Sequence, residues 1–235
     1  MAEKKAPEAV SEKRSIIYEI LRVLAQIVFH TLMPVKCHNR ERLDAEGPYV
    51  LIANHLHALD PVAMAMFIPK RQIVFLAKKE LGKNKLIENL LTRAHCIMVG
   101  RHNTDMAAMR SCMKAVKMKK ILLIFPEGTR HHEGQMEQIE SGASLIAMRS
   151  GSPVIPIYID RKMGLFKRTN MYVGDPIPYD DLLEKGINAE TCEEMNERFR
   201  ETFRRMIAER EAASQKNKKN FSSRQEKQAG KRKYL

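Results

Sequence analysis

The stretch that most constrains the fold is residues 49–62, where an apolar run passes directly into a polar loop and then into a helix start. Residues 49–53 read Tyr-Val-Leu-Ile-Ala and follow a Gly-Pro pair, which predicts a turn and then a short buried strand. Asp60 and Pro61 precede good helix formers, a combination typical of the first turn of a helix. The segment therefore predicts a strand, a short loop and a helix in immediate succession.

The loop carries His55, which can pair with Asp60. The two residues are five positions apart, which on a continuous helix would separate them by roughly 140°, so they meet only if the loop curls back. A carboxylate that accepts from one imidazole nitrogen fixes the tautomer and leaves the other nitrogen free to take a proton from a hydroxyl. The pair predicts general-base chemistry. The alternatives are that Asp60 only caps the helix and that His55 only bonds to backbone.

Further apolar runs alternate with helical patterns along the chain. This order predicts an α/β fold with a mixed, mostly parallel central sheet flanked by helices. Sites in such sheets lie at the carboxyl ends of strands, and His55, Arg101 and residues 127–130 each follow a predicted strand. We therefore expect them to share one edge of the sheet. The predicted strands are 49–53, 73–77, 94–99, 121–125, 153–159 and 170–173, with an edge strand within 35–43, and the predicted helices are 62–68, 85–93, 104–119, 136–148 and 189–211.

Four blocks occur in a characteristic order between residues 42 and 178. They are His-x4-Asp from His55, Ile-Met-Val-Gly-Arg at 97–101, Phe-Pro-Glu-Gly-Thr-Arg at 125–130 and Val-Ile-Pro-Ile-Tyr at 154–158. Together they resemble the lysophosphatidic acid acyltransferase family, in the glycerolipid acyltransferase group. The resemblance implies transfer of a fatty acyl group from a thioester to the free hydroxyl of lysophosphatidic acid, which gives phosphatidic acid in phospholipid synthesis.

The resemblance implies a role for each motif residue. His55 is expected to be the base for the acceptor hydroxyl, and Asp60 is expected to orient it. Arg101 and Arg130 are the expected clamps for the acceptor phosphate, because a guanidinium presents a bidentate fork. No cofactor is expected, and the acyl donor is either acyl-CoA or acyl carrier protein.

The residues between the predicted strand 121–125 and Arg130 are expected to line the substrate. Gly128 would let the backbone approach a ligand closely, and Thr129 could donate to phosphate. Glu127 could accept from a substrate hydroxyl or orient Arg130, and the alternative is an internal ion pair between these two side chains.

One position departs from the family pattern. Family members commonly have Phe-Lys shortly before Gly142, whereas this chain has Ile139 and Glu140. An acyltransferase for another lipid or an amine acceptor therefore stays an alternative. A non-catalytic membrane-binding protein is a further alternative, disfavoured because His55, Asp60, Glu127 and the other motif residues are all present.

Charge predicts the class of partner. The net charge is +13, and residues 214–235 hold eight Lys or Arg and one Glu. A basic chain suits an anionic membrane surface and a phosphorylated lysolipid. No nucleic-acid motif is visible and Trp is absent, so no nucleic-acid partner is expected. Because it is basic and poor in apolar residues, the 214–235 segment is predicted to be a disordered tail that attracts anionic lipid.

The N-terminal region predicts how the protein reaches its substrate. Residues 1–14 are expected to be loose, 15–33 to form an amphipathic helix and 35–211 to form the acyltransferase domain. Only residues 23–33 of this helix are free of charged residues, and a segment of that length is too short to span a bilayer. The helix either packs on the domain or lies in the lipid headgroup region. No signal peptide is visible, so we expect a peripheral or monotopic protein at the cytoplasmic face of the cell membrane.

No metal site is expected. The four cysteines are isolated, without a Cys-x-x-Cys pair, which argues against a structural metal. His131, His132 and Glu133 are adjacent in sequence, but neighbouring side chains diverge.

Overall fold

The structure is a computed structural model that describes residues 15–68, 70–78, 84–94, 96–100, 106–130 and 136–232, with the backbone alone at residues 78 and 141 and from 217 onward. Arg101 lies outside the described residues, so its predicted role in phosphate binding stays a prediction. The expectations for residues 1–14 and for the run 131–133 fall outside them as well.

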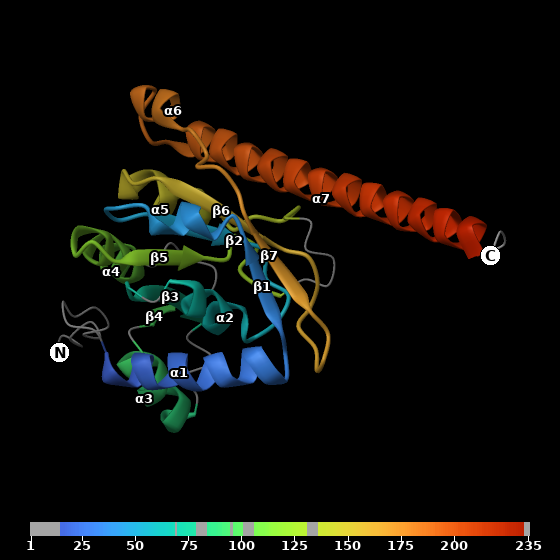
Figure 1. Ribbon diagram of the computed structural model, residues 1–235. Coiled ribbons are helices and arrows are strands. Elements are labelled where there is room, and N and C mark those ends of the chain that lie inside the picture. Colours follow the sequence, from blue (N-terminus) through green and yellow to red (C-terminus); the bar gives the residue numbers. More distant parts are fainter. Residues whose placement is uncertain are drawn as a thin grey trace, which may run out of the picture.

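The described part of the chain forms a seven-stranded sheet in the order β1-β7-β6-β2-β5-β3-β4 (Figure 1). Neighbouring strands run parallel except for β6 and β7, which are antiparallel. The predicted α/β fold with a mixed, mostly parallel sheet is therefore confirmed. The strands are β1 (Val35–His38), β2 (Val50–Ala53), β3 (Ile73–Lys78), β4 (Ile97–Val99), β5 (Ile121–Ile124), β6 (Val154–Ile159) and β7 (Thr169–Val173).

Helices cover both faces of the sheet. One face carries α1 (Ile16–Thr31), α2 (Asp60–Phe67) and α3 (Lys85–Arg93), and α1 packs against both of the others (Figure 1). The opposite face carries α4 (Met106–Lys117), α5 (Ser141–Ser150) and the long α7 (Ala189–Arg232). Two short elements, the 3₁₀ helix η1 (Arg40–Asp44) and α6 (Asp180–Glu184), complete the described structure.

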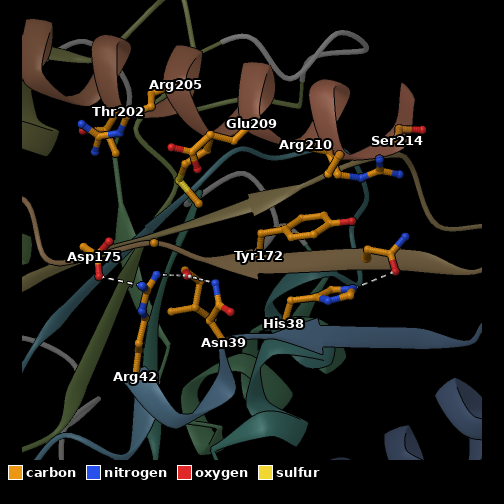
Figure 2. Close-up of a pocket in the computed structure, with 15 residues that line it drawn as sticks. His38, Asn39, Arg42, Tyr172, Asp175, Thr202, Arg205, Glu209, Arg210 and Ser214 are labelled. Atoms are coloured by element: carbon orange, nitrogen blue, oxygen red, sulfur yellow. Dashed lines mark hydrogen bonds and ion pairs between the residues drawn. The ribbon is translucent and has the colours of Figure 1, made fainter. Parts of the chain in front are cut away.

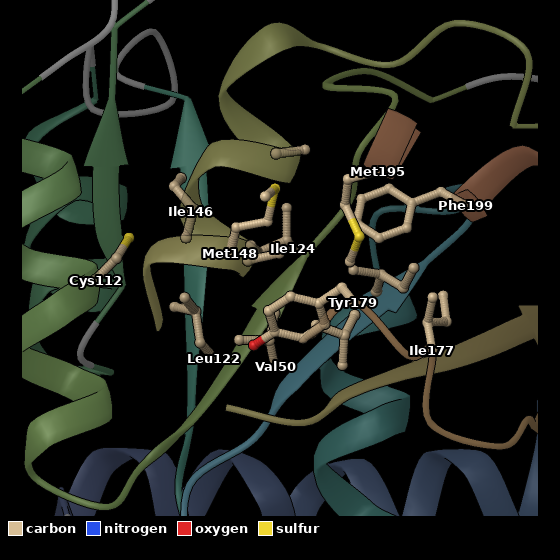
Figure 3. Close-up of a cluster of buried hydrophobic side chains, with 14 of the residues drawn as sticks. Val50, Cys112, Leu122, Ile124, Ile146, Met148, Ile177, Tyr179, Met195 and Phe199 are labelled. Atoms are coloured by element: carbon tan, nitrogen blue, oxygen red, sulfur yellow. The ribbon is translucent and has the colours of Figure 1, made fainter. Parts of the chain in front are cut away.

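Each face has its own hydrophobic core because successive strand residues point to opposite sides of the sheet. In β2, Val50 and Ile52 join the cluster beneath α4, α5 and α7, part of which is shown in Figure 3. Leu51 and Ala53 join the cluster beneath α1 and α2. All four side chains are fully buried, so the continuous apolar run of β2 reflects a central strand covered on both faces.

The predicted N-terminal helix is present as α1. Its N-cap is Ser15, whose hydroxyl oxygen accepts from the Tyr18 amide at 3.3 Å. Tyr18, Ala25 and Phe29 are buried on the domain. No helix in the described ranges is both long and apolar enough to cross a membrane.

The prediction of a disordered tail from residue 214 is wrong, because α7 continues through Arg232. The tail contains no Pro, and its single Gly, Gly230, lies near the end of the helix. Adding a residue to an existing helix costs far less free energy than nucleating a new one, and Lys, Arg, Gln and Ala are good helix formers. The segment is too polar to form a core of its own, yet that does not stop it from extending a helix that packs elsewhere.

Candidate active site

The loop after β2 is folded around one carboxylate oxygen. Asp60 Oδ2 accepts from His55 Nδ1 at 2.9 Å and from the amides of Leu56 at 2.8 Å and His57 at 2.7 Å. Asp60 is fully buried at the start of α2. The loop therefore curls back as the pairing of His55 with Asp60 requires, and the predicted contact is present.

The other imidazole nitrogen of His55 remains available to a ligand. A carboxylate only accepts, so Nδ1 carries the proton that points at Asp60 and the neutral ring has a lone pair on Nε2. Nε2 makes no hydrogen bond with any described residue, and the side chain is 18% exposed. The ring is stacked on Phe125, with centroids 4.1 Å apart. Packing and a hydrogen bond thus hold the ring in one orientation.

Glu127 links the loop after β5 to the loop after β2. It is buried, with 4% exposure, and its Oε2 accepts from the backbone N–H of His55 at 3.0 Å. The sequence suggested a substrate hydroxyl or Arg130 as the partner of Glu127, and the contact with the His55 amide was not predicted. No sequence pattern signals it, because the two residues meet only once β2 and β5 pair in the sheet.

Asn54 is a second contributor that the sequence did not single out. The side chain is fully buried, donates to the Ile159 carbonyl at 3.0 Å and accepts from the Ile159 amide at 2.8 Å. These two bonds fasten the residue before His55 to the end of β6. The sequence did contain a signal for Asn54, because it is a polar residue directly after the apolar run 49–53.

The turn at the end of β5 needs glycine. Gly128 has φ +61° and its amide donates to the Phe125 carbonyl at 3.0 Å. The positive φ favours glycine, and a Cβ atom there would lie 2.5 Å from Cγ of Glu140, so any other residue would displace the Glu140 side chain. Thr129 and Arg130 follow and are exposed.

The structure thus brings His55, Asp60 and residues 127–130 to the carboxyl ends of the paired strands β2 and β5. The part of the chain that the structure describes contains no cluster of His, Cys, Asp or Glu that could hold a metal ion.

A separate cavity of about 900 Å³ lies between α7 and the strands β1 and β7 (Figure 2). Its groups largely satisfy one another: His38 stacks on Tyr172 at 4.5 Å, Arg210 lies over the Tyr172 ring at 5.6 Å, and Arg42 pairs with Asp175 at 2.8 Å. None of the predicted site residues within the described ranges lines it, so the candidate active site remains at the ends of β2 and β5.

The chain is an acyltransferase: a family model described as Acyltransferase matches residues 34–160, which include His55, Asp60 and the turn at 127–130. The chain is 33% identical to the 1-acyl-sn-glycerol-3-phosphate acyltransferase of Bacillus subtilis, over 71% of this chain and 87% of that protein. It is 29% identical to the enzyme of the same name from Streptococcus pneumoniae, over 73% and 66% of the two chains. The chain therefore belongs to the 1-acyl-sn-glycerol-3-phosphate acyltransferase family.

A solved structure agrees on the fold. The crystal structure of the 1-acyl-sn-glycerophosphate (LPA) acyltransferase PlsC from Thermotoga maritima aligns with a TM-score of 0.61 over 83% of this chain and 81% of that chain. The sequence identity is 19%, so this likeness supports the fold alone.

Proposed function

We propose that the protein transfers a fatty acyl group from an acyl thioester to the free hydroxyl of lysophosphatidic acid, giving phosphatidic acid. The observation that carries the proposal is the His55 imidazole, held by Asp60 with its Nε2 unbonded, beside the turn that bears Arg130. The names of the relatives in Bacillus subtilis and Streptococcus pneumoniae support this acceptor. Acyl-CoA and acyl carrier protein both supply the required thioester.

The site supports a direct transfer. His55 Nε2 takes the hydroxyl proton while the acceptor oxygen attacks the thioester carbonyl, so a C–O bond forms. The C–S bond then breaks, and the imidazolium returns its proton to the departing thiolate. Buried Asp60 stabilises the imidazolium through Nδ1. General-base catalysis of this kind contributes about 10²–10⁴-fold to the rate.

The test of the proposal is an acylation assay of the purified protein with labelled acyl-CoA and labelled acyl carrier protein against a panel of lysolipids. We expect labelled phosphatidic acid from lysophosphatidic acid. Absence of product with every donor would contradict the proposed function.

Arg130 is proposed to hold the acceptor phosphate. It is exposed at the end of the turn and makes no hydrogen bond or ion pair with a described residue. Lysine keeps the charge but loses the fork that binds two phosphate oxygens. We therefore expect Arg130→Lys to raise the KM for lysophosphatidic acid about tenfold or more, while the KM for the donor changes little.

Steady-state kinetics with each substrate varied in turn measure this effect. Arg149→Lys is the matched control, because Arg149 is an exposed arginine near the far end of α5 and should leave both KM values unchanged. An equal rise in both KM values for Arg130→Lys would indicate a structural role instead.

We further propose that the protein attaches peripherally to the cytoplasmic face of the membrane through an apolar surface of α1 and α3, the α1–α3 surface. These two helices pack together and lie on the same face as α2, which begins with Asp60. Large apolar side chains exposed to water in such number are typical of a docking surface. They are Ile16, Ile20, Val23, Leu24, Ile27, Leu86, Ile87 and Leu90, each 41–79% exposed.

The long helix α7 lies on the face of the sheet opposite the α1–α3 surface. It packs on α5 and β6, across the sheet from α1 (Figure 1). Lipid can therefore cover the α1–α3 surface without contacting the packed half of α7. We assign the main attachment to the α1–α3 surface, and long-range attraction to anionic lipid to the basic residues from 214 onward.

Charged substitutions on the exposed face of α1 should weaken this attachment. Burial of one Ile side chain is worth about 1.5–3 kcal/mol, so Ile20→Glu with Ile27→Glu should lower binding to anionic vesicles at least tenfold at both low and high salt. Vesicle flotation measures the bound fraction. Ile187→Glu is the control, because Ile187 is an exposed isoleucine in the segment between α6 and α7. Unchanged flotation of the double variant would rule out the α1–α3 surface.

A further inference from the structure

Glu140 is tied to the turn that carries the candidate site residues. It directly precedes α5, and its amide donates to the Pro126 carbonyl at 2.8 Å. Pro126 is the first residue of the turn that continues through Glu127 to Arg130. The start of α5 is therefore fixed beside the site by a backbone hydrogen bond.

The Glu140 side chain lies over the turn. Although it is at the N-cap of α5, it does not cap the helix. Its Cγ and Oε1 lie 2.5 Å and 2.9 Å from the position that a Cβ of Gly128 would take. Glu140 is exposed and makes no side-chain hydrogen bond or ion pair with a described residue. A carboxylate without a partner among the described residues thus lies against Gly128, which follows buried Glu127 in the turn and precedes exposed Thr129 and Arg130.

This placement changes the electrostatics of the acceptor site. Arg130 attracts a phosphate, whereas the Glu140 carboxylate, which lies against Gly128 two residues before Arg130 in the turn, repels a second negative charge and attracts a cation. A lysolipid whose phosphate is esterified to an ammonium-bearing headgroup can bind both side chains. Its phosphate carries a single negative charge that Arg130 attracts, and its ammonium carries a positive charge that Glu140 attracts.

We propose that Glu140 is a specificity-determining residue that makes the site accept lysophospholipids with an ammonium-bearing headgroup in addition to lysophosphatidic acid. The inference rests on the proposed acyl transfer and leaves its chemistry unchanged. The acyl C–O bond forms at the glycerol hydroxyl, the thioester C–S bond breaks, and the proton passes through His55 to the thiol. The headgroup amine stays protonated and binds Glu140 without reacting.

The test compares kcat/KM for lysophosphatidylethanolamine and for lysophosphatidic acid in the wild type, Glu140→Gln and Glu140→Lys. We expect the ratio of the first to the second to fall about tenfold or more in Glu140→Lys and by a smaller factor in Glu140→Gln. The glutamine variant keeps the shape of the side chain, so it preserves packing on Gly128 while removing the charge. Glu137→Lys, an equal charge change at an exposed residue on the same segment, should leave the ratio unchanged.

The possible failures can be told apart. Acylation of lysophosphatidic acid by the wild type without acylation of lysophosphatidylethanolamine would overturn the inference and leave the proposed function standing. A ratio that stays within twofold in both Glu140 variants would overturn it in the same way. A wild type that acylates neither lipid would overturn both. An equal fall of the ratio in Glu137→Lys would show a general effect of charge and not a role of Glu140.

Discussion

Replacement of His55 with alanine is expected to lower kcat by about 10²–10⁴-fold, because it removes the group that takes the proton from the acceptor hydroxyl. The ring is held by Asp60 and Phe125. Substrate binding uses other residues, so both KM values should change little. Initial rates of thiol release with saturating donor and acceptor measure the effect.

The control for this variant is His57→Ala. His57 lies in the same loop, and its Nδ1 accepts from the Leu59 amide at 3.2 Å, while its own backbone amide binds Asp60. Alanine retains that backbone contact, so activity should stay within about tenfold of the wild type. Circular dichroism and vesicle flotation should be normal for both variants. A His55→Ala enzyme with activity within tenfold of the wild type would show that another group is the base.

The sequence predicts most of the fold because the strands of a sheet covered on both faces read as continuous apolar runs. Residues 121–125 and 153–159 are such runs, and they become β5 and β6 with ends shifted by a single residue. The contact of His55 with Asp60 could also be predicted, since both residues belong to one short loop whose turn and helix start are visible in the sequence.

Contacts between distant segments could not be predicted in the same way. Asn54 meets Ile159 and His55 meets Glu127 only because β2 lies between β5 and β6, and periodicity does not give the order of strands. The sequence marked Glu140 as unusual, but its position over Gly128 depends on how α5 follows the turn. The composition of residues 214–235 correctly indicated that they form no core of their own. It did not reveal that they extend the helix that begins at Ala189.

Replacement of Asp60 with asparagine is expected to lower kcat about 10²-fold or more while leaving both KM values within a few-fold. The amide oxygen can still accept from His55 Nδ1 and from the amides of Leu56 and His57, so the loop keeps its shape. The negative charge that stabilises the imidazolium is lost, and this charge matters only when His55 has taken the proton. An effect confined to kcat therefore separates a role in the transition state from a role in binding.

The same substitution should also destabilise the fold, because Asp60 Oδ1 is buried without a hydrogen-bond partner among the described residues. An amide NH₂ placed there would lack an acceptor, at a cost of about 1–3 kcal/mol. Asp160→Asn is the matched control: that carboxylate is nearly buried and accepts from the backbone and side chain of Asn170, both at 2.9 Å. It should lose stability and retain kcat below its melting temperature. If the two variants lose kcat equally, the effect of Asp60 is structural, and the assignment of Asp60 as the partner that makes His55 a base is wrong.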